Sequence, residues 1–140
     1  MDFEMSYSAK QEEFRDDVRS WLAENVTPEA LVDGPDARVT YAARRMLGGR
    51  LGMQGWLYPT APARYGGGGL DPASALIIGE ELRRLGLDRP PYYDTGGWLG
   101  SETILAWGTE EQKNRLLPPI YRGEVRTWQL LTEPEAGSDL

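Results

Sequence analysis

The feature that most constrains this chain is a single predicted β-strand near its C-terminal end, preceded by a series of predicted helices. An apolar run, residues 128–131, is typical of a buried strand, which we expect to begin near Val125. One buried strand cannot pair its own backbone N–H and C=O groups. We therefore expect it to pair with strands outside these 140 residues. We also expect a boundary between a helical domain, residues 1–123, and the start of a β domain, residues 124–140.

The predicted strand leads into a turn of small residues. The chain passes Pro134 and then reaches Gly137, Ser138 and Asp139, a combination that indicates a turn rich in backbone N–H donors and hydroxyl groups. Such donors suit a planar, phosphate-bearing cofactor, because they can bind its anionic oxygens. From the residues alone, the turn is a candidate cofactor site of unspecified type.

The composition excludes several kinds of chemistry within this chain. It contains no Cys and no His, which excludes disulfides, thiolate catalysis, Ser-His-Asp hydrolysis and His-bound zinc, and we expect no metal site. The net charge of −7 disfavours nucleic acid as a partner, since phosphate binding needs a basic face. No apolar run approaches the roughly 20 residues that span a bilayer. The acidic N-terminus lacks the apolar core of a signal peptide, which predicts a cytoplasmic protein.

Helix signals divide the first half of the chain. A capping box at Ser8 and Gln11 predicts a helix that ends before Pro28. Its apolar stripe consists of Phe14, Val18, Trp21 and Leu22. Residues 31–38 are expected to be a loop, and residues 41–52 a second helix. This second helix is weaker, because each interior glycine costs about 1 kcal/mol relative to alanine.

A third helix has the strongest start signal. Asp71 followed by Pro72 is a favourable N-cap and first helical position, and Gly86 supplies the stop. The apolar face consists of Ala75, Ile78, Leu82 and Leu85. Glu80 and Glu81 are candidates for a general base, but we interpret both as part of a solvated helix face.

Two more helices are predicted before the strand. A short one contains Trp98 and Trp107 and is closed by Gly108. A second capping box opens at Thr109, and two consecutive prolines from Pro118 are expected to end the helix that follows.

Residues 59–70 are predicted to form a long loop that contains four consecutive glycines, residues 66–69. The glycine run suggests a phosphate-binding loop. However, no Lys-Ser or Lys-Thr pair follows it, and the third glycine of a G-x-G-x-x-G pattern would fall on Asp71. We therefore favour a flexible connector into the next helix.

Taken in order, these segments resemble the flavin-dependent acyl-CoA dehydrogenases over almost the whole chain. The most specific are GTEEQK at residues 108–113 and LTEPEAGSD at residues 131–139, which is similar to the family's T-E-P-x-A-G-S-D flavin motif. Weaker similarity covers the first helix, the G-W…P…Y-G-G loop that starts at Gly55, and the G-E-E-L segment that starts at Gly79.

The resemblance implies a helical N-terminal domain, a β-barrel middle domain and a helical-bundle C-terminal domain. This chain would supply the first domain and the first strand of the second. The implied cofactor is FAD, and the implied reaction is α,β-dehydrogenation of an acyl-CoA thioester in fatty acid or lipid metabolism. In that reaction a carboxylate removes the α-proton while the β-hydrogen leaves as hydride to flavin N5. An electron-transfer flavoprotein as acceptor and a homo- or hetero-tetramer are also implied.

The resemblance assigns cofactor-binding residues by motif position. Thr132 matches the threonine whose hydroxyl contacts the flavin ring, and Gln129 and Leu131 match strand positions beside that ring. Gly137 belongs to the same motif. Ser138 matches the serine that contacts the FAD pyrophosphate or the CoA portion of the substrate.

The resemblance also implies where substrate specificity and catalysis reside. The segment before GTEEQK lines part of the acyl pocket in the family, and Trp98 is bulky enough to shape such a pocket, with loop or core packing as the alternative. The family's base is a carboxylate of the C-terminal domain, and no residue here matches it. We therefore assign no catalytic residue and expect the chain alone to be inactive.

Two other interpretations stay open. One is a non-catalytic partner subunit or helical interaction module of the same fold, which the sequence beyond Leu140 would distinguish. The other is a related flavoprotein, such as an acyl-CoA oxidase or nitroalkane oxidase, which differs in how its reduced flavin reacts with oxygen. Two positions also depart from the family's pattern: Glu135 replaces the usual glycine, and Gln129 an aromatic residue that is frequent there.

Overall fold

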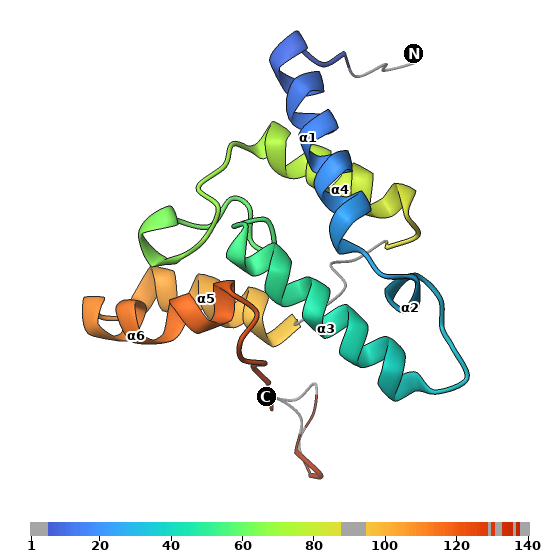
Figure 1. Ribbon diagram of the computed structural model, residues 1–140. Helices are drawn as coiled ribbons and strands as arrows, with labels where there is room; N and C mark the ends of the chain where they lie inside the picture. Colours follow the sequence, from blue (N-terminus) through green and yellow to red (C-terminus); the bar gives the residue numbers. More distant parts are fainter. Residues whose placement is uncertain (1–5, 88–94, 129, 131–132, 136, 138–140) are drawn as a thin grey trace.

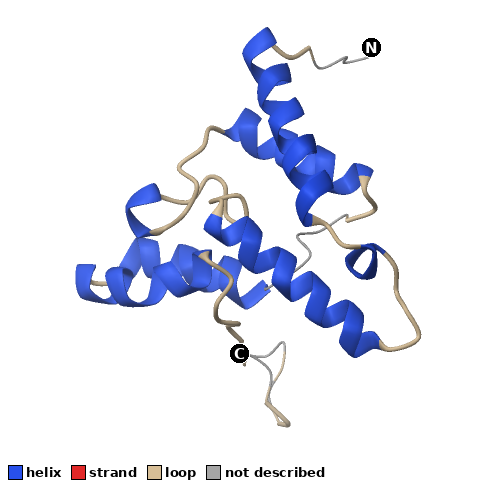
Figure 2. Cartoon of the chain, in the orientation of Figure 1, coloured by secondary structure: helices blue, strands red, loops and turns tan. Residues whose placement is uncertain are grey.

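The regular structure is helical throughout the part of the chain that the computed structural model describes, residues 6–87, 95–128, 130, 133–135 and 137 (Figure 1). Figure 2 shows helices joined by loops across this part. The helices are α1 (Ala9–Asn25), α2 (Pro28–Leu31), α3 (Ala37–Met53), the 3-10 helix η1 (Ala63–Tyr65), α4 (Pro72–Arg84), α5 (Thr95–Trp107) and α6 (Glu110–Tyr121). The prediction of a mainly α chain is confirmed.

The helices pack in pairs, with α3 between them. α1 packs on α4, α5 packs on α6, and the short α2 packs on α3. Figure 1 shows α3 running between the α1–α4 pair and the α5–α6 pair. Leu47 and Leu51 of α3 share one core with Val18 of α1 and Ile77 of α4. Burial of these side chains is the main favourable term that holds the helices together.

The helices begin where the capping signals predict. At the start of α1, the Gln11 N–H donates to Ser8 Oγ at 3.4 Å and the Ser8 N–H donates to Gln11 Oε1 at 2.8 Å. Thr109 forms the same capping box at the start of α6. The Asp71 carboxylate accepts hydrogen bonds from the first N–H groups of α4. These bonds satisfy donors that have no partner inside the helix.

The predicted apolar stripe of α1 is confirmed as part of the core. Val18 and Leu22 are buried, and Phe14 and Trp21 pack at the edge of the same core. Both aromatic rings meet Trp56 edge to face, with ring centroids 5.9 and 5.2 Å away.

A second, smaller core lies under α6. It consists of Ala61, Tyr65, Leu117, Ile120 and Tyr121. Tyr58 packs against both cores, and its ring centroid lies 5.1 Å from that of Tyr121. Among the described residues, Tyr58 is the one side chain assigned to both clusters.

The prediction that the prolines end the last helix is wrong, because α6 continues to Tyr121. The Pro118 carbonyl accepts a hydrogen bond from the Arg122 N–H at 3.0 Å, so the backbone remains helical past the missing donors. Ile120 and Tyr121 are almost completely buried. Their burial favours the additional turn over the break that the local signal predicts.

The described residues after α6 contain no strand at the predicted position. Residues 125–128 and Leu130 have no regular structure, while residues 129, 131 and 132 lie outside the described part. A strand requires a neighbouring edge to pair with, and the described segments are helices and loops. Pairing with strands beyond these residues stays a prediction.

Candidate functional site

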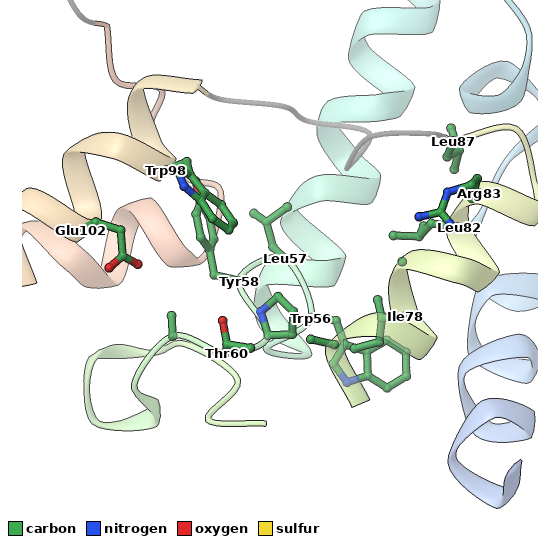
Figure 3. Close-up of a pocket in the computed structure, with 14 residues that line it drawn as sticks. Trp56, Leu57, Tyr58, Thr60, Ile78, Leu82, Arg83, Leu87, Trp98 and Glu102 are labelled. Carbon is green, nitrogen blue, oxygen red and sulfur yellow. The ribbon is translucent and has the colours of Figure 1, made fainter. Parts of the chain in front are cut away.

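An apolar cavity of about 320 Å³ lies between α4, α5 and the loop after α3. Figure 3 shows side chains from all three segments around it. The main apolar residues in its wall are Trp56, Leu57, Tyr58, Ile78, Leu82, Leu87 and Trp98. A cavity of this size with aliphatic and aromatic walls suits an apolar group of a small molecule.

The predicted apolar face of α4 forms one wall of the cavity. Ala75, Ile78 and Leu82 line it, together with Gly79, which has no side chain to cover the helix backbone. Leu85, the last position of the predicted stripe, is exposed and does not line the cavity. The sequence therefore located this wall as the apolar face of a helix, without indicating that the face borders a cavity.

Trp98, which the sequence predicts to shape the acyl pocket, lines the cavity from α5. Its side chain is 57% exposed, so it stands at the rim. The adjacent face of α5 is buried at Ser101, whose hydroxyl donates to the Trp98 carbonyl at 3.1 Å. Contact between the Trp98 side chain and a substrate stays a prediction.

Polar groups lie at the ends of the cavity. Figure 3 shows Arg83 of α4 and Glu102 of α5 on opposite sides, with the Thr60 hydroxyl between them. The apolar middle and polar ends are typical of ligand pockets, in which a few polar groups fix the orientation of a mostly apolar ligand. Sequence reasoning missed these three residues because none belongs to a recognisable motif.

The glycine run is a packed part of the site, so the prediction of a flexible connector is wrong. The N–H groups of Gly68 and Gly69 donate to the carbonyls of Tyr58 and Ala61 at 3.1 and 2.8 Å. A Cβ atom on Gly67 would collide with the backbone of Ala61. Glycine is required where two backbones approach this closely. The run folds the loop back on itself and fixes the side of the cavity that Pro59 and Thr60 form.

The interpretation of Glu81 as a solvated residue is also wrong, since its side chain is buried. Arg15 Nη1 and Arg19 Nε of α1 donate to its two carboxylate oxygens, each at 2.9 Å. Burial alone would raise the pKa of Glu81, but the hydrogen bonds and charges of Arg19 and Arg15 outweigh it and hold the pKa below its usual value. Glu80 pairs with Arg15 and accepts a hydrogen bond from the Tyr7 hydroxyl, both at 2.8 Å. The ion pairs of Glu80 and Glu81 with Arg15 and Arg19 tie α1 to α4. Neither carboxylate lines the cavity, so neither is placed to act as a base there.

Most of the predicted cofactor residues lie outside the described part of the chain, namely Gln129, Leu131, Thr132 and Ser138. Gly137 is described and is half-buried in a bend. Two apolar side chains of the same segment are exposed to solvent, Trp128 at 75% and Leu130 at 91%.

Neither a metal cluster nor a membrane helix is found in the described residues. These residues hold no group of three or more Asp or Glu side chains placed to bind a metal ion. Within the same part of the chain, the helices are too short or too polar to cross a membrane.

The helical architecture is that of the N-terminal domain of acyl-CoA dehydrogenases. Residues 8–124 match the family described as "Acyl-CoA dehydrogenase, N-terminal domain". The chain therefore belongs to the acyl-CoA dehydrogenase family, and the resemblance read from its motifs is confirmed.

Individual relatives support the same assignment. Acyl-CoA dehydrogenase FadE26 of Mycobacterium tuberculosis is 33% identical over 139 residues, which cover 97% of this chain and 34% of the relative. Mitochondrial isovaleryl-CoA dehydrogenase of Bos taurus is 31% identical over 131 residues, which cover 94% of this chain and 30% of the relative. The chain thus spans about a third of the length of these curated relatives.

Two solved structures share the fold. The ChsE4-ChsE5 complex from Mycobacterium tuberculosis aligns with a TM-score of 0.64 and 32% identity, covering 98% of this chain and 34% of that one. An acyl-CoA dehydrogenase complexed with FAD from Bacillus anthracis aligns with a TM-score of 0.60 and 27% identity, covering 96% of this chain and 22% of that one.

Proposed function

We propose that this chain is the N-terminal portion of an FAD-dependent acyl-CoA dehydrogenase, an oxidoreductase that forms a double bond between Cα and Cβ of an acyl-CoA thioester. Residues 1–123 form its helical domain, and residues 124–140 begin its β domain. The observation that carries the proposal is the order of two features. The family match ends at residue 124, just after α6, and the LTEPEAGSD motif follows at residues 131–139.

FAD is the proposed cofactor, held in part by Gln129, Leu131, Thr132, Gly137 and Ser138. These residues offer the groups that a flavin needs: main-chain donors and a hydroxyl for the polar edge of the ring, and a hydroxyl at a glycine turn for the pyrophosphate. The exposed Trp128 and Leu130 supply apolar surface in the same segment. When bound, FAD supplies the acceptor for the hydride that leaves Cβ.

The apolar cavity is proposed to form part of the acyl site. Trp98 stands at its opening, and Ile78 and Leu82 form its side on α4. These side chains exclude water and hold an acyl group by burial of apolar surface, at about 25 cal/mol per Å². Ser138 is proposed to contact the CoA portion of the same substrate.

The base that removes the α-proton is proposed to come from outside these residues. Glu81, the most buried carboxylate among the described residues, is bound by Arg15 and Arg19 and does not line the cavity. We therefore infer that the chain alone does not turn over substrate. In the complete enzyme, an electron-transfer flavoprotein is the proposed acceptor and a homo- or hetero-tetramer the proposed assembly.

Two measurements test this function. The complete protein should bind FAD, its flavin absorbance should bleach on addition of an acyl-CoA, and it should reduce ferricenium with turnover. The 140-residue chain should show no turnover in the same assay. A complete protein that binds no flavin, or clear activity of the chain alone, would contradict the proposal.

A non-catalytic partner subunit is the second candidate. It is favoured by the similarity to the ChsE4-ChsE5 complex, an assembly of two proteins. This alternative predicts that the complete protein is inactive when purified alone and becomes active only after a second, related chain is added. Activity of the complete protein by itself would exclude it.

A further inference from the structure

The chain that leaves α6 runs along one stripe of α3. Figure 1 shows this segment passing beside α3 after α6 ends. Gly123 adopts a left-handed conformation with φ +67°, and a Cβ atom there would lie 3.4 Å from the Gly48 carbonyl oxygen. A Cβ atom on Gly52 would collide with the backbone of Arg122. The absence of a side chain at Gly52 thus lets the two backbones touch.

Two side chains of α3 continue this contact further along the segment. Arg45 Nη2 donates to the Glu124 carbonyl at 3.4 Å. The Arg126 guanidinium lies over the Tyr41 ring, 5.4 Å from its centroid, and also over the Trp128 ring at 5.8 Å. Cation–π contacts at these distances are favourable.

The contacts form an ordered series. Tyr41, Arg45, Gly48 and Gly52 recur at i, i+4, i+7 and i+11, which places them on one face of α3. Read from Gly52 back to Tyr41, they meet Arg122, Gly123, Glu124 and Arg126 in sequence order. The segment therefore runs antiparallel to α3, guided at four successive points.

We propose that this stripe of α3 positions the flavin-binding motif, and that Tyr41 is a positioning residue through Arg126. The inference rests on the proposed function. Thr132 follows Arg126 by six residues, so the chain between them spans at most about 20 Å. Fixing Arg126 confines the path of the motif before the cofactor binds. A preorganised segment loses less conformational freedom on binding, which appears as tighter binding.

The test uses the complete holoenzyme with Tyr41→Ala, Tyr41→Phe and, as a control at an exposed position on a different side of the same helix, Val39→Ala. Tyr41→Ala should weaken FAD binding about two- to five-fold, the effect of losing one exposed cation–π contact. It should also speed trypsin cleavage after Arg126 in the apoprotein. Tyr41→Phe keeps the aromatic face and should restore both properties, while Val39→Ala should change neither.

The outcomes separate the two proposals. A wild-type complete protein that binds no FAD overturns the proposed function, and this inference with it. A wild-type protein that binds FAD, together with a Tyr41→Ala variant of unchanged affinity and cleavage rate, overturns the inference alone. Failure of Tyr41→Phe to restore binding, or equal losses in Val39→Ala, also overturns it. Arg126→Gln provides a second variant, for which the same weakening is expected from the other side of the contact.

Discussion

Glu81 of α4 and Arg15 of α1 form a buried ion pair across the helix interface, with Glu81 Oε1 2.9 Å from Arg15 Nη1. The two residues are 66 positions apart in sequence. Arg19, from the next turn of α1, pairs with the other carboxylate oxygen of Glu81. Removing one member of a buried pair is costly, because the other charge remains desolvated.

Replacing Glu81 by glutamine should therefore destabilise the chain by about 1.5–3 kcal/mol, because Arg15 and Arg19 lose a charged partner, while Glu80 still pairs with the buried Arg15. The measurement is the free energy of unfolding in urea. Glu13→Gln on the exposed side of α1 is the control and should change stability by less than about 0.5 kcal/mol. Equal stability of the two variants would contradict the role assigned to the pair.

The contribution of the Glu81–Arg15 pair should also appear in the pH dependence of the free energy of unfolding. The pKa of Glu81 is lowered in the folded state, whereas Arg15 has a raised pKa and stays protonated throughout. A carboxylate with a depressed folded pKa stabilises the fold above its unfolded pKa, near 4.5, and this contribution is lost as the pH falls through the folded pKa. The stability difference between wild type and Glu81→Gln should be constant at neutral pH and shrink below about pH 4.5. A difference that grows toward acid would show the opposite linkage.

Two glycines three residues apart on α3 should respond in opposite ways to alanine. A Cβ atom on Gly52 collides with the Arg122 backbone, while one on Gly49 meets nothing within 4 Å. Gly52→Ala should cost about 1–3 kcal/mol through overpacking. Gly49→Ala should stabilise the helix by about 0.5–1 kcal/mol. Urea unfolding of both variants measures the two effects, and a stabilised Gly52→Ala variant would argue against the close approach of α3 and the end of α6.

Substrate selection should depend on Trp98 if the cavity forms part of the acyl site. In the complete enzyme, Trp98→Ala enlarges the opening and should shift the ratio of kcat/KM for long over short acyl-CoA substrates by about tenfold. Trp107→Ala is the matched control, because Trp107 lies on the same helix, is 86% exposed and does not line the cavity. An unchanged chain-length profile in Trp98→Ala would remove Trp98 from the substrate site.

Local signals predicted much of this fold. The capping boxes at Ser8 and Thr109 and the N-cap at Asp71 each mark a helix start, because the bonds that cap a helix join residues two or three apart. The apolar spacing of α4 also located a wall of the cavity. Family motifs in the right order were sufficient to assign the family.

The predictions that were wrong have a common physical cause: contacts between segments that are distant in the chain. Helical spacing shows the neighbours of Glu81 on its own helix, such as Arg84, but not Arg15 on α1. A run of glycines does not reveal which backbone it touches, so Gly67 and its contact with Ala61 were missed. The prolines of α6 were predicted to end the helix because they lack backbone N–H donors. Burial of the residues that follow them instead favours another helical turn.

Tyr58 joins two apolar cores that otherwise consist of different residues. Molecules divided in this way often open by parts, and each part has its own free energy of opening. Amide hydrogens of α5 and α6 can then exchange with solvent while those of α1, α3 and α4 stay protected. We expect the ring of Tyr58, which packs against both cores, to couple the two exchange rates. Since side chains of α4 and α5 both line the cavity, we expect the separation of these two parts to widen its opening.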